Sequence, residues 1–445
     1  MNFFKPLCSD AFLPKTLLLV AGMFLPIRAA QIGGLEVNGS GWMQYGYIGH
    51  STDTALGSEF GEKSLYASGA QFTLGAKPFQ KLEIKAGLGM LGNHYVNRSV
   101  NSSGGYAPFQ FVPFITEGNF KYSFWGEEAS SLYVRGGLFA FNYNPDTKNL
   151  GQYLMRGPVY PGLLVSGFET KNGTPSENIA ALQMHHQMGS FRQDAFLISE
   201  TETYPYFDIS AVYVASLHIG GVFQMGAGVN FFHLIPADDS VTNGKKFAYV
   251  DTVPSPRDTT FLTFPGTKLM AYASFDPKAL LEIVGPFGPE DLKLYGEVAL
   301  FGLNNDAAHK AVYGDYLHRM PMMVGFNLPA FNVLDYLSLE VEWYGAPFPD
   351  DFATFNHTRA NIPSPFPTDY TSQNRDLNVK EDNWKWALGG AKMIQNRIRI
   401  SGQVANDHFR PGVFSGYGDN YPPGSESLLK SSKDWAGTVK VAVFF

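Results

Sequence analysis

The sequence predicts an all-β protein: a transmembrane, antiparallel, up-and-down barrel of about sixteen strands, with short turns at one end and long loops at the other. Three observations predict this fold. Segments of about ten residues with alternating apolar and polar side chains recur along the chain. The connections between them are alternately short and long, and the composition is rich in aromatic residues and poor in charge.

The composition differs from that of a soluble domain. Only 16% of the 445 residues are charged, 15% are aromatic, and glycine occurs 47 times. Soluble proteins carry about 25% charged residues. No run of ~20 apolar residues follows the N-terminal region, so no helix is expected to span a bilayer. A chain with these properties fits a barrel, in which apolar residues are dispersed at every second position.

The N-terminal region has the order of a secretory signal. Lys5 and Lys15 precede the apolar run 17–25, and the small residues Ala29 and Ala30 follow it. This order of basic, apolar and small residues is typical of a signal peptide that is cleaved during export.

We therefore divide the chain into a cleaved signal peptide, residues 1–30, and a single barrel domain, residues 31–445. The one cysteine, Cys8, precedes the apolar run, so it cannot be the lipidated residue of a lipoprotein. The formal net charge is −7, and it becomes more negative when the basic signal is removed. This charge argues against a nucleic-acid partner.

Sixteen segments carry the expected strands. They span 35–49, 64–77, 81–96, 114–125, 131–143, 178–188, 191–201, 206–217, 220–233, 267–276, 291–303, 319–329, 335–346, 383–393, 396–407 and 433–445. The last shows the alternation most clearly, with Val439, Val441 and Val443 on one face and Thr438 and Lys440 on the other. The same alternation is present in several others, but the faces of 178–201 cannot be assigned.

The long connections are rich in Asn, Asp, Gly, Pro and Ser, which is typical of loops. They are 97–113, 144–177, 234–266, 347–382 and 408–432. Two connections break the alternation: 202–205 is short where a long loop is due, and 277–290 is long where a turn is due. The strand count could therefore differ by two.

Many charged residues fall on the polar faces of the expected strands. An isolated charge facing hydrocarbon costs about 2–4 kcal/mol at the middle of a barrel wall, so these side chains should face water or one another. They line either a water-filled pore or a lumen plugged by structural salt bridges. The candidate pore-lining residues are Lys85, Glu117, Lys121, Arg135, Lys293, Glu297, Glu340, Glu342, Lys385, Arg397, Arg399 and Lys440. Because the two signs nearly balance, weak ion selectivity is expected.

Motifs that could carry other chemistry have simpler interpretations. Gly87, Gly89 and Gly92 spell G-x-G-x-x-G, but a dinucleotide site needs that run between a strand and a helix. His185 and His186 could bind a metal, but adjacent strand residues face opposite sides.

The acidic pairs Asp238-Asp239 and Asp350-Asp351 could hold calcium, although solvated loop charge is the simpler interpretation. The histidines are scattered over loops, and no serine has a G-x-S-x-G setting. We expect no catalytic residue, no metal and no cofactor.

The end of the chain resembles a known class. The amphipathic final strand, which ends at Phe445, is similar to the signal that the bacterial outer-membrane assembly machinery recognises. With the export signal and the strand count, the whole of 31–445 resembles the sixteen-stranded porins of Gram-negative bacteria. The resemblance implies location in the outer membrane, contact with its lipid and lipopolysaccharide, folding by the barrel assembly machinery, and a homotrimer as a candidate assembly.

In such porins the loop after the fifth strand folds inward and narrows the pore. Here that position is taken by 144–177, which carries Asp146, Lys148 and Arg156 as candidate constriction residues. The acidic, Gly-rich constriction motif of the general trimeric porins is not visible in it.

The function expected from these features is passive diffusion of small hydrophilic solutes through a pore of mixed charge. One alternative is a structural or adhesive barrel with a closed lumen that acts through its long loops, 347–382 and 408–432. A second alternative, transport of hydrophobic solutes, requires an apolar path, which the charged faces oppose.

Overall fold

The computed structural model describes residues 30–32, 34–51, 60–97, 110–127, 130–155, 177–201, 207–237, 246–251, 258–263, 265–281, 285–303, 314–345, 384–406, 429 and 431–445. The predicted signal peptide therefore lies outside the described residues apart from Ala30. Among the described residues, no helix has the length and apolar character needed to cross a membrane.

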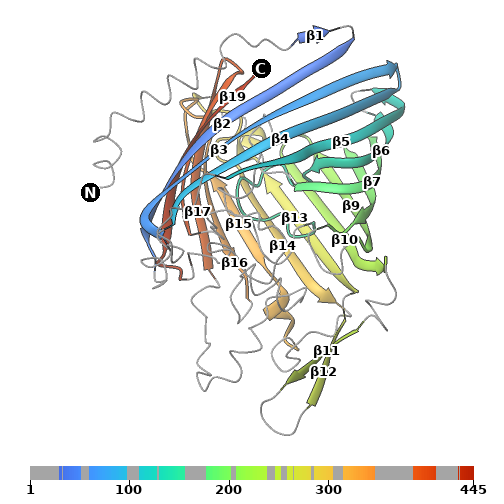
Figure 1. The fold of residues 1–445 in the computed structure, drawn as a ribbon, viewed down its shortest axis with the longest axis vertical. Helices are drawn as coiled ribbons and strands as arrows, with labels where there is room; N and C mark the ends of the chain where they lie inside the picture. Colours follow the sequence, from blue (N-terminus) through green and yellow to red (C-terminus); the bar gives the residue numbers. More distant parts are fainter. Residues whose placement is uncertain are drawn as a thin grey trace.

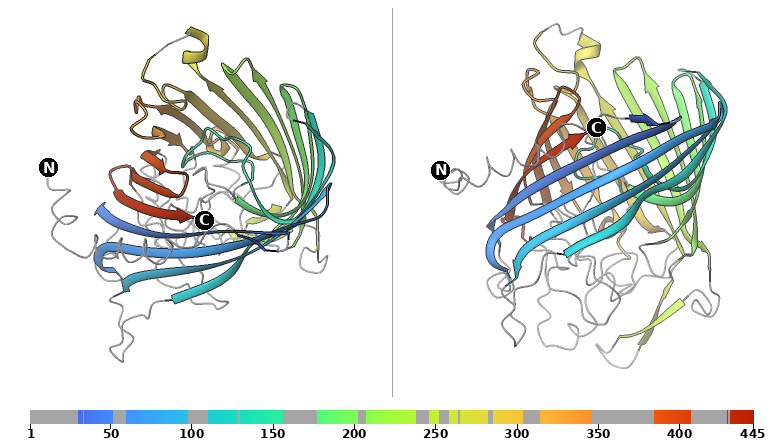
Figure 2. Two further views of the ribbon diagram at one scale, coloured as in Figure 1. Left: turned by 90° about the horizontal axis from the view of Figure 1, so that it is seen from above. Right: turned by 45° about the horizontal axis from the view of Figure 1, so that its top comes forward.

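Sixteen strands form a closed antiparallel barrel, which confirms the predicted fold class (Figures 1 and 2). They are β2 (Leu35–His50), β3 (Phe60–Phe79), β4 (Leu82–Asn97), β5 (Gln110–Glu127), β6 (Ser130–Phe141), β7 (Glu177–Met188), β8 (Phe191–Ser199), β9 (Ile209–Ile219), β10 (Phe223–Ile235), β13 (Gly266–Phe275), β14 (Leu294–Leu303), β15 (Met322–Asn327), β16 (Tyr336–Trp343), β17 (Trp384–Ile394), β18 (Ile398–Asn406) and β19 (Trp435–Phe444). Each pairs with its neighbours in sequence, and β19 pairs with β2 to close the ring. The short β1 (Ala30–Ile32) adds to β2.

The two ends of the barrel differ in their connections. One end, here called the turn end, carries connections such as 189–190, 220–222 and 395–397, and the loop end carries the long ones. The two irregular connections are real features and not signs of a different strand count. Residues 200–208 join β8 and β9 at the loop end, and 276–293, which contains α4 (Pro277–Leu281), joins β13 and β14 at the turn end.

The structure also corrects two expectations. The connection 234–266, predicted as a loop, contains a separate hairpin of β11 (Lys246–Asp251) and β12 (Asp258–Thr263), which projects from the barrel in Figure 1. Residues 319–329, predicted as one strand, begin inside the 3-10 helix η2 (Tyr316–Arg319), and β15 starts only at Met322. Asp315 caps η2 by accepting a hydrogen bond from the amide of Leu317.

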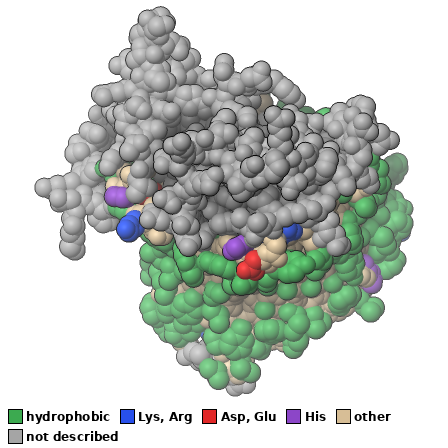
Figure 3. All heavy atoms as spheres, turned by 90° about the horizontal axis from the view of Figure 1, so that it is seen from below, with side chains coloured by type: hydrophobic (Ala, Val, Ile, Leu, Met, Phe, Trp, Pro, Cys, Tyr) green, Lys and Arg blue, Asp and Glu red, His purple; other side chains and the backbone are tan. Residues whose placement is uncertain are grey.

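The strands have one apolar face and one polar face, as β16 illustrates. Leu339 is 40% exposed and Val341 is 38% exposed, whereas Ser338, Glu340 and Glu342 are buried inside the ring. Figure 3 shows hydrophobic side chains across most of the described outer surface of the barrel that is visible in that view. The barrel therefore presents an apolar exterior and encloses its polar side chains.

The chain end closes the seam between β19 and β2. The amide of Phe445 donates to the carbonyl oxygen of Gly39 at 3.0 Å, and the amide of Gly39 donates to Phe445 at 2.9 Å. The Phe445 ring lies over Gly39, where an added Cβ would come within 2.4 Å of it. Its centroid is 5.8 Å from that of Phe72 on β3. Glycine at position 39 thus leaves room for the terminal aromatic ring.

Candidate functional site

Residues 142–155, here called the inward segment, follow β6 and fold into the barrel ring (Figure 2). They contact the inner faces of β14 and β16, which lie about 150 to 190 positions later in the chain. Asp146 and Lys148 belong to the inward segment. Arg156, the third candidate constriction residue, lies outside the described residues.

Glu340 on β16 holds the middle of the inward segment. Its carboxylate, which is 0% exposed, accepts hydrogen bonds from three consecutive backbone amides: Lys148 at 2.6 Å, Asn149 at 2.9 Å and Leu150 at 2.8 Å. The hydroxyl of Tyr295 donates a fourth at 2.9 Å. The inward segment has no helix or strand to satisfy its amides, so the carboxylate replaces the partners that secondary structure would supply.

Glu297 on β14 holds the two ends of the same segment. It accepts from the amides of Gln152 at 3.1 Å and Tyr153 at 2.7 Å. It also accepts from the Tyr143 hydroxyl at 2.5 Å and the side-chain amide of Asn144 at 3.0 Å. Glu297 is therefore a structural acceptor for the segment.

Glu342, two positions after Glu340, accepts from the Tyr153 hydroxyl at 2.8 Å. Glu297 on β14 and Glu340 and Glu342 on β16 thus bind the inward segment. We call the inner faces of these two strands, together with β15 between them, the anchor wall.

The inward segment also packs into an apolar core inside the ring. Tyr143, Leu150, Tyr153 and Leu154 of the segment are buried in this core. The strands contribute Phe139, Phe141, Ile179, Ala181, Phe196, Ile198, Val212, Val214, Met270, Tyr272, Tyr295, Ala299, Phe301 and Met323, and Tyr344 follows directly after β16. This part of the interior resembles the core of a globular domain.

Sequence reasoning missed this core, and β8 shows why. Leu197 points outward and is 50% exposed, whereas its neighbours Phe196 and Ile198 point inward and are buried. Because both faces of the strand are apolar, the alternation on which the facing prediction relied is absent in 178–201. The run of apolar residues was itself the available sign of a packed interior.

A second region of the inner surface has a different character. We call the inner faces of β4, β5 and β6 the solvated wall, because their charged side chains keep contact with solvent. The Lys85 ammonium lies 2.9 Å from the Glu83 carboxylate, with 39% and 29% of the two side chains exposed.

Two further cations of the solvated wall lie over aromatic rings. The Lys121 ammonium is 4.2 Å from the centroid of Tyr133. The Arg135 guanidinium is 4.1 Å from that of Phe139 and donates to the Asn119 side chain at 3.1 Å.

The remaining predicted lining residues are spread around the ring. Glu117 accepts from the Thr73 hydroxyl at 2.8 Å on the solvated wall. Lys385 is buried and donates to the carbonyl oxygen of Leu429 at 3.0 Å.

The basic residues near the seam lie in different settings. Lys440 lies 4.5 Å from the Trp42 ring centroid, on the inner face of β19. Arg397 lies in the exposed turn 395–397 instead of on a strand face, whereas Arg399 faces inward.

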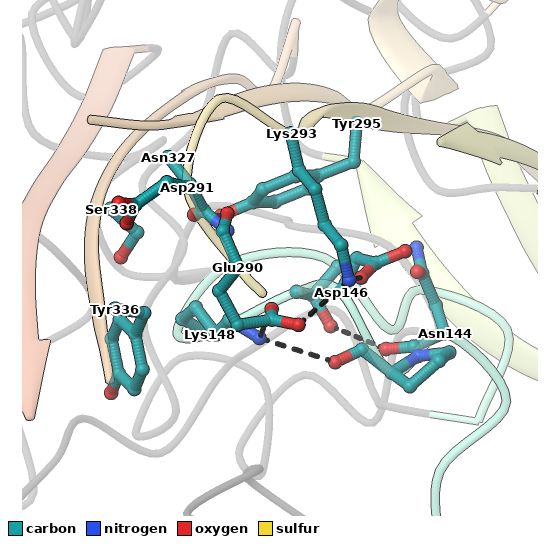
Figure 4. A network of polar contacts seen from close by, with 12 residues as sticks. Asn144, Asp146, Lys148, Glu290, Asp291, Lys293, Tyr295, Asn327, Tyr336 and Ser338 are labelled. Atoms are coloured by element: carbon teal, nitrogen blue, oxygen red, sulfur yellow. Dashed lines mark hydrogen bonds and ion pairs between the residues drawn. The ribbon is translucent and has the colours of Figure 1, made fainter. Parts of the chain in front are cut away.

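A row of alternating charges joins the inward segment to the long turn 276–293 (Figure 4). The Lys293 ammonium lies 3.3 Å from Asp146 and 2.7 Å from Glu290, and the Lys148 ammonium lies 3.0 Å from Glu290. Burial alone would raise the pKa of Glu290, but Lys148 and Lys293 outweigh it and hold that pKa below its ordinary value. Burial would lower the pKa of Lys293, but Asp146 and Glu290 raise it above its ordinary value.

This row of charges borders a cavity of about 550 Å³ at the turn end. Tyr336 and Arg399 line it on one side, and His218, Gln224 and Ser274 line it on another. Sequence reasoning did not identify this cavity, because 277–290 was recognised only as a connection that is longer than the expected turn.

Several residues that suggested other chemistry have structural roles. Gly87, Gly89 and Gly92 lie within β4, away from any helix. His185 points inward and its ring stacks on that of Tyr133, with 4.4 Å between the ring centroids, whereas His186 points outward. In the part of the chain that the structure describes, no group of three metal-ligating side chains comes together. The acidic pairs at 238–239 and 350–351 lie outside that part.

A serine, a histidine and an aspartate do meet at the loop end, although no sequence motif indicated it. His233 Nδ1 lies 3.1 Å from the Asp208 carboxylate, and the Ser210 hydroxyl accepts a hydrogen bond from the backbone amide of His233. The Ser210 hydroxyl itself donates to Glu200. These bonds join residues on either side of 202–206, and the Ser210 proton is engaged by Glu200, so they do not activate the serine as a nucleophile.

Comparison with known proteins gives likeness in architecture alone. No protein-family model matches the chain, and no curated protein matches it. A double mutant of the porin of Rhodopseudomonas blastica aligns over 92% of this chain and 100% of its own, at 9% identity and a TM-score of 0.43. OmpF of Salmonella typhi in complex with daunomycin aligns over 92% of this chain and 97% of its own, at 9% identity and a TM-score of 0.46. At this level of similarity, the functional argument rests on the chain's own residues.

Proposed function

We propose that this chain is an outer-membrane channel through which small hydrophilic solutes diffuse passively. The observation that carries the proposal is the solvated wall: charged, partly exposed side chains inside a closed barrel whose outer face is apolar. A barrel interior with solvent-accessible charges offers polar solutes a path across the hydrocarbon layer.

The apolar exterior supports the membrane location. Phe72, Leu88, Ile115 and Val324 all point outward and are 48% to 68% exposed. In water such a surface would cost about 25 cal/mol for each Å² of apolar area, whereas lipid chains accept it. The turn end then faces the periplasm and the loop end faces the outside, with lipid and lipopolysaccharide around the barrel.

The path for solutes is narrow and lies to one side. The inward segment and its apolar core occupy the interior from the loop-end part of β6 through β7, β8, β9 and β13 to the anchor wall. In this proposal the passage runs along the rest of the solvated wall, past Lys85, Lys121 and Arg135. In this proposal the inward segment sets the width of the channel, and no cofactor takes part.

Phe445 is proposed as the assembly signal. Its ring completes the outer face of β19 and closes the seam on Gly39. Deletion of Phe445 should lower the amount of folded barrel in the outer membrane, measured by heat-modifiable migration in gels. Unchanged levels of the folded protein would contradict the assembly role.

The closed-lumen alternative has one observation in its favour, namely the apolar core formed by residues such as Phe139, Tyr153 and Leu154. If such a core filled the whole cross-section of the ring, the lumen would be closed and the barrel would have a structural or adhesive role. The solvent contact of Lys85 and Glu83 favours a channel instead.

Recordings from the purified protein without residues 1–30 in a planar bilayer test the proposal. We expect discrete, ohmic conductance steps in KCl, together with a circular dichroism spectrum typical of β-structure. A folded barrel that inserts and never conducts would overturn the channel and support the closed-lumen alternative.

A further inference from the structure

The cavity at the turn end has features of a binding site for solute. Its volume of about 550 Å³ falls within the range of about 300–1,000 Å³ typical of small-molecule sites. Asp146 and Lys148 of the inward segment form part of its lining, so the cavity lies against that segment at the turn end of the barrel. The residues that carry the argument are Asp146, Lys148, Glu290, Lys293, Tyr336 and Arg399.

The long turn 276–293 builds one side of this cavity. Asp291 is 0% exposed and accepts hydrogen bonds from the amides of Gly288, Ala330 and Phe331 at 2.8 to 3.1 Å. These bonds join the turn to the next one, 328–335, and fix the neighbouring Glu290 in position. Two residues are enough to connect adjacent antiparallel strands, so the turn between β13 and β14 is much longer than the connection requires. Its added residues place Glu290 beside Lys148 and Lys293.

The charges of the cavity alternate in sign over short distances. Asp146, Lys293, Glu290 and Lys148 follow one another with contacts of 2.7 to 3.3 Å. Opposite charges at such distances cancel when viewed from afar but leave strong local fields. A solute with a net charge therefore gains little attraction, whereas a solute that carries both charges can contact a cation and an anion at once.

Beyond this row, Tyr336 connects two cations. The Lys148 ammonium lies 5.3 Å from its ring centroid and the Arg399 guanidinium 5.7 Å from it. Arg399 also donates to the Tyr336 hydroxyl at 3.4 Å. Asp335, directly before Tyr336, lies 3.1 Å from the Lys392 ammonium, and its side chain is 38% exposed at the same cavity. Arg399 can bind a carboxylate while Asp335 or Glu290 binds an ammonium.

We propose that this cavity binds zwitterionic solutes of the size of amino acids or dipeptides on their way through the barrel. The inference rests on the proposed channel and specifies the solute class that it retains. The solute carboxylate contacts Arg399 and the Tyr336 hydroxyl, and the solute ammonium contacts Asp335 or Glu290.

The test is block of the ion current by two small probes added on the turn-end side. Diglycine is zwitterionic at neutral pH, and erythritol is neutral and similar in size. We expect diglycine to reduce the KCl current in a saturable way and erythritol to leave it unchanged at equal concentration. Arg399→Gln should raise the half-blocking concentration of diglycine about tenfold, the effect of one charge-assisted hydrogen bond.

Arg397→Gln is the matched control, because Arg397 lies two residues away in the exposed turn and does not line the cavity. It should leave diglycine block unchanged. Asp335→Asn, at the exposed rim, replaces Arg399→Gln if that variant fails to fold, and should weaken block in the same direction. Equal block by erythritol, or an equal effect of Arg397→Gln, would overturn the proposal. Normal KCl conductance without block would overturn it and leave the channel intact, whereas absence of any conductance would overturn both.

Discussion

The anchor wall and the solvated wall carry the same kinds of residue on the same face of one sheet, yet the residues behave differently. Glu340 on the anchor wall is fully buried and bonded to three backbone amides, whereas Glu83 on the solvated wall meets solvent and pairs with Lys85. The difference comes from the inward segment, which covers one wall and leaves the other. A charged residue on a barrel's inner face therefore either holds structure or lines a passage, depending on what covers it.

The largest effect is expected from removing the anchor at Glu340. Glu340→Ala leaves the amides of Lys148, Asn149 and Leu150 without their acceptor, and breaking a network around a buried charge costs about 3–5 kcal/mol. We expect that loss in the free energy of unfolding, measured by urea denaturation in detergent micelles. Glu83→Ala on the solvated wall is the control and should cost less than ~1 kcal/mol. Similar losses for the two variants would remove the distinction between the walls.

A smaller effect is expected from the apolar contacts of the inward segment. Leu154 is buried in the core inside the ring, and truncation of a buried leucine costs about 2–5 kcal/mol. Leu154→Ala should therefore destabilise the barrel toward the lower end of that range, because the segment keeps its carboxylate anchors. Leu339→Ala, on the outer face of β16, is the control. If Leu154→Ala proves neutral, the segment is held by its hydrogen bonds alone.

The row of charges at the turn end should give a still smaller effect, which depends on pH. The pKa of Glu290 is lowered in the folded state. Its contribution to the free energy of unfolding is therefore fully present above about pH 4.5, the ordinary pKa of a glutamate, and is lost as the pH falls through the lower pKa of the folded protein. The pKa of Lys293 is raised in the folded state. Its contribution to the free energy of unfolding is therefore fully present below about pH 10.5, the ordinary pKa of a lysine, and is lost as the pH rises through the higher pKa of the folded protein. The melting temperature of the protein relative to a Glu290→Gln, Lys293→Met variant should therefore be highest between these limits. A difference that does not vary with pH would contradict the network.

The smallest effect on stability, with a clear effect on conduction, is expected on the solvated wall. Lys121→Glu together with Arg135→Glu reverses two charges that lie over aromatic rings beside the proposed passage. The reversal potential in a KCl gradient should shift toward cation preference, and the shift should shrink in 1 M salt, where screening acts within ~3 Å. Selectivity that stays the same in a conducting variant would place the passage elsewhere.

The sequence predicted the barrel well, because every barrel strand needs an apolar outer face. The period of two in 335–346 and 433–445 followed from that requirement, and the burial of β16 and β19 agrees with it. Inward folding of the connection after β6 was anticipated only through resemblance. That Glu297 and Glu340 bind its backbone could not be predicted, because a lumen-facing glutamate has the same sequence pattern whether water or amide groups surround it.

The turn-end cavity was hidden for a related reason. Asp291 and Glu290 are adjacent acidic-turn residues in the sequence, and only the structure shows one fixing the turn and the other pairing with lysines. The apolar core was hidden because both faces of β8 are apolar, which removes the pattern from which facing is inferred. In each case the missing information was which segment covers the strand.

Cysteine accessibility during single-channel recording tests the central claim most directly, namely that the passage follows the solvated wall. The one natural cysteine, Cys8, lies within residues 1–30, so single-cysteine variants of the protein without them carry no other thiol. Lys85→Cys places the thiol on the solvated wall, and Ala299→Cys places it in the buried core on the anchor wall. We predict that a charged methanethiosulfonate reagent changes the conductance of Lys85→Cys in steps and leaves that of Ala299→Cys unchanged. Steps in Ala299→Cys without steps in Lys85→Cys would contradict the account.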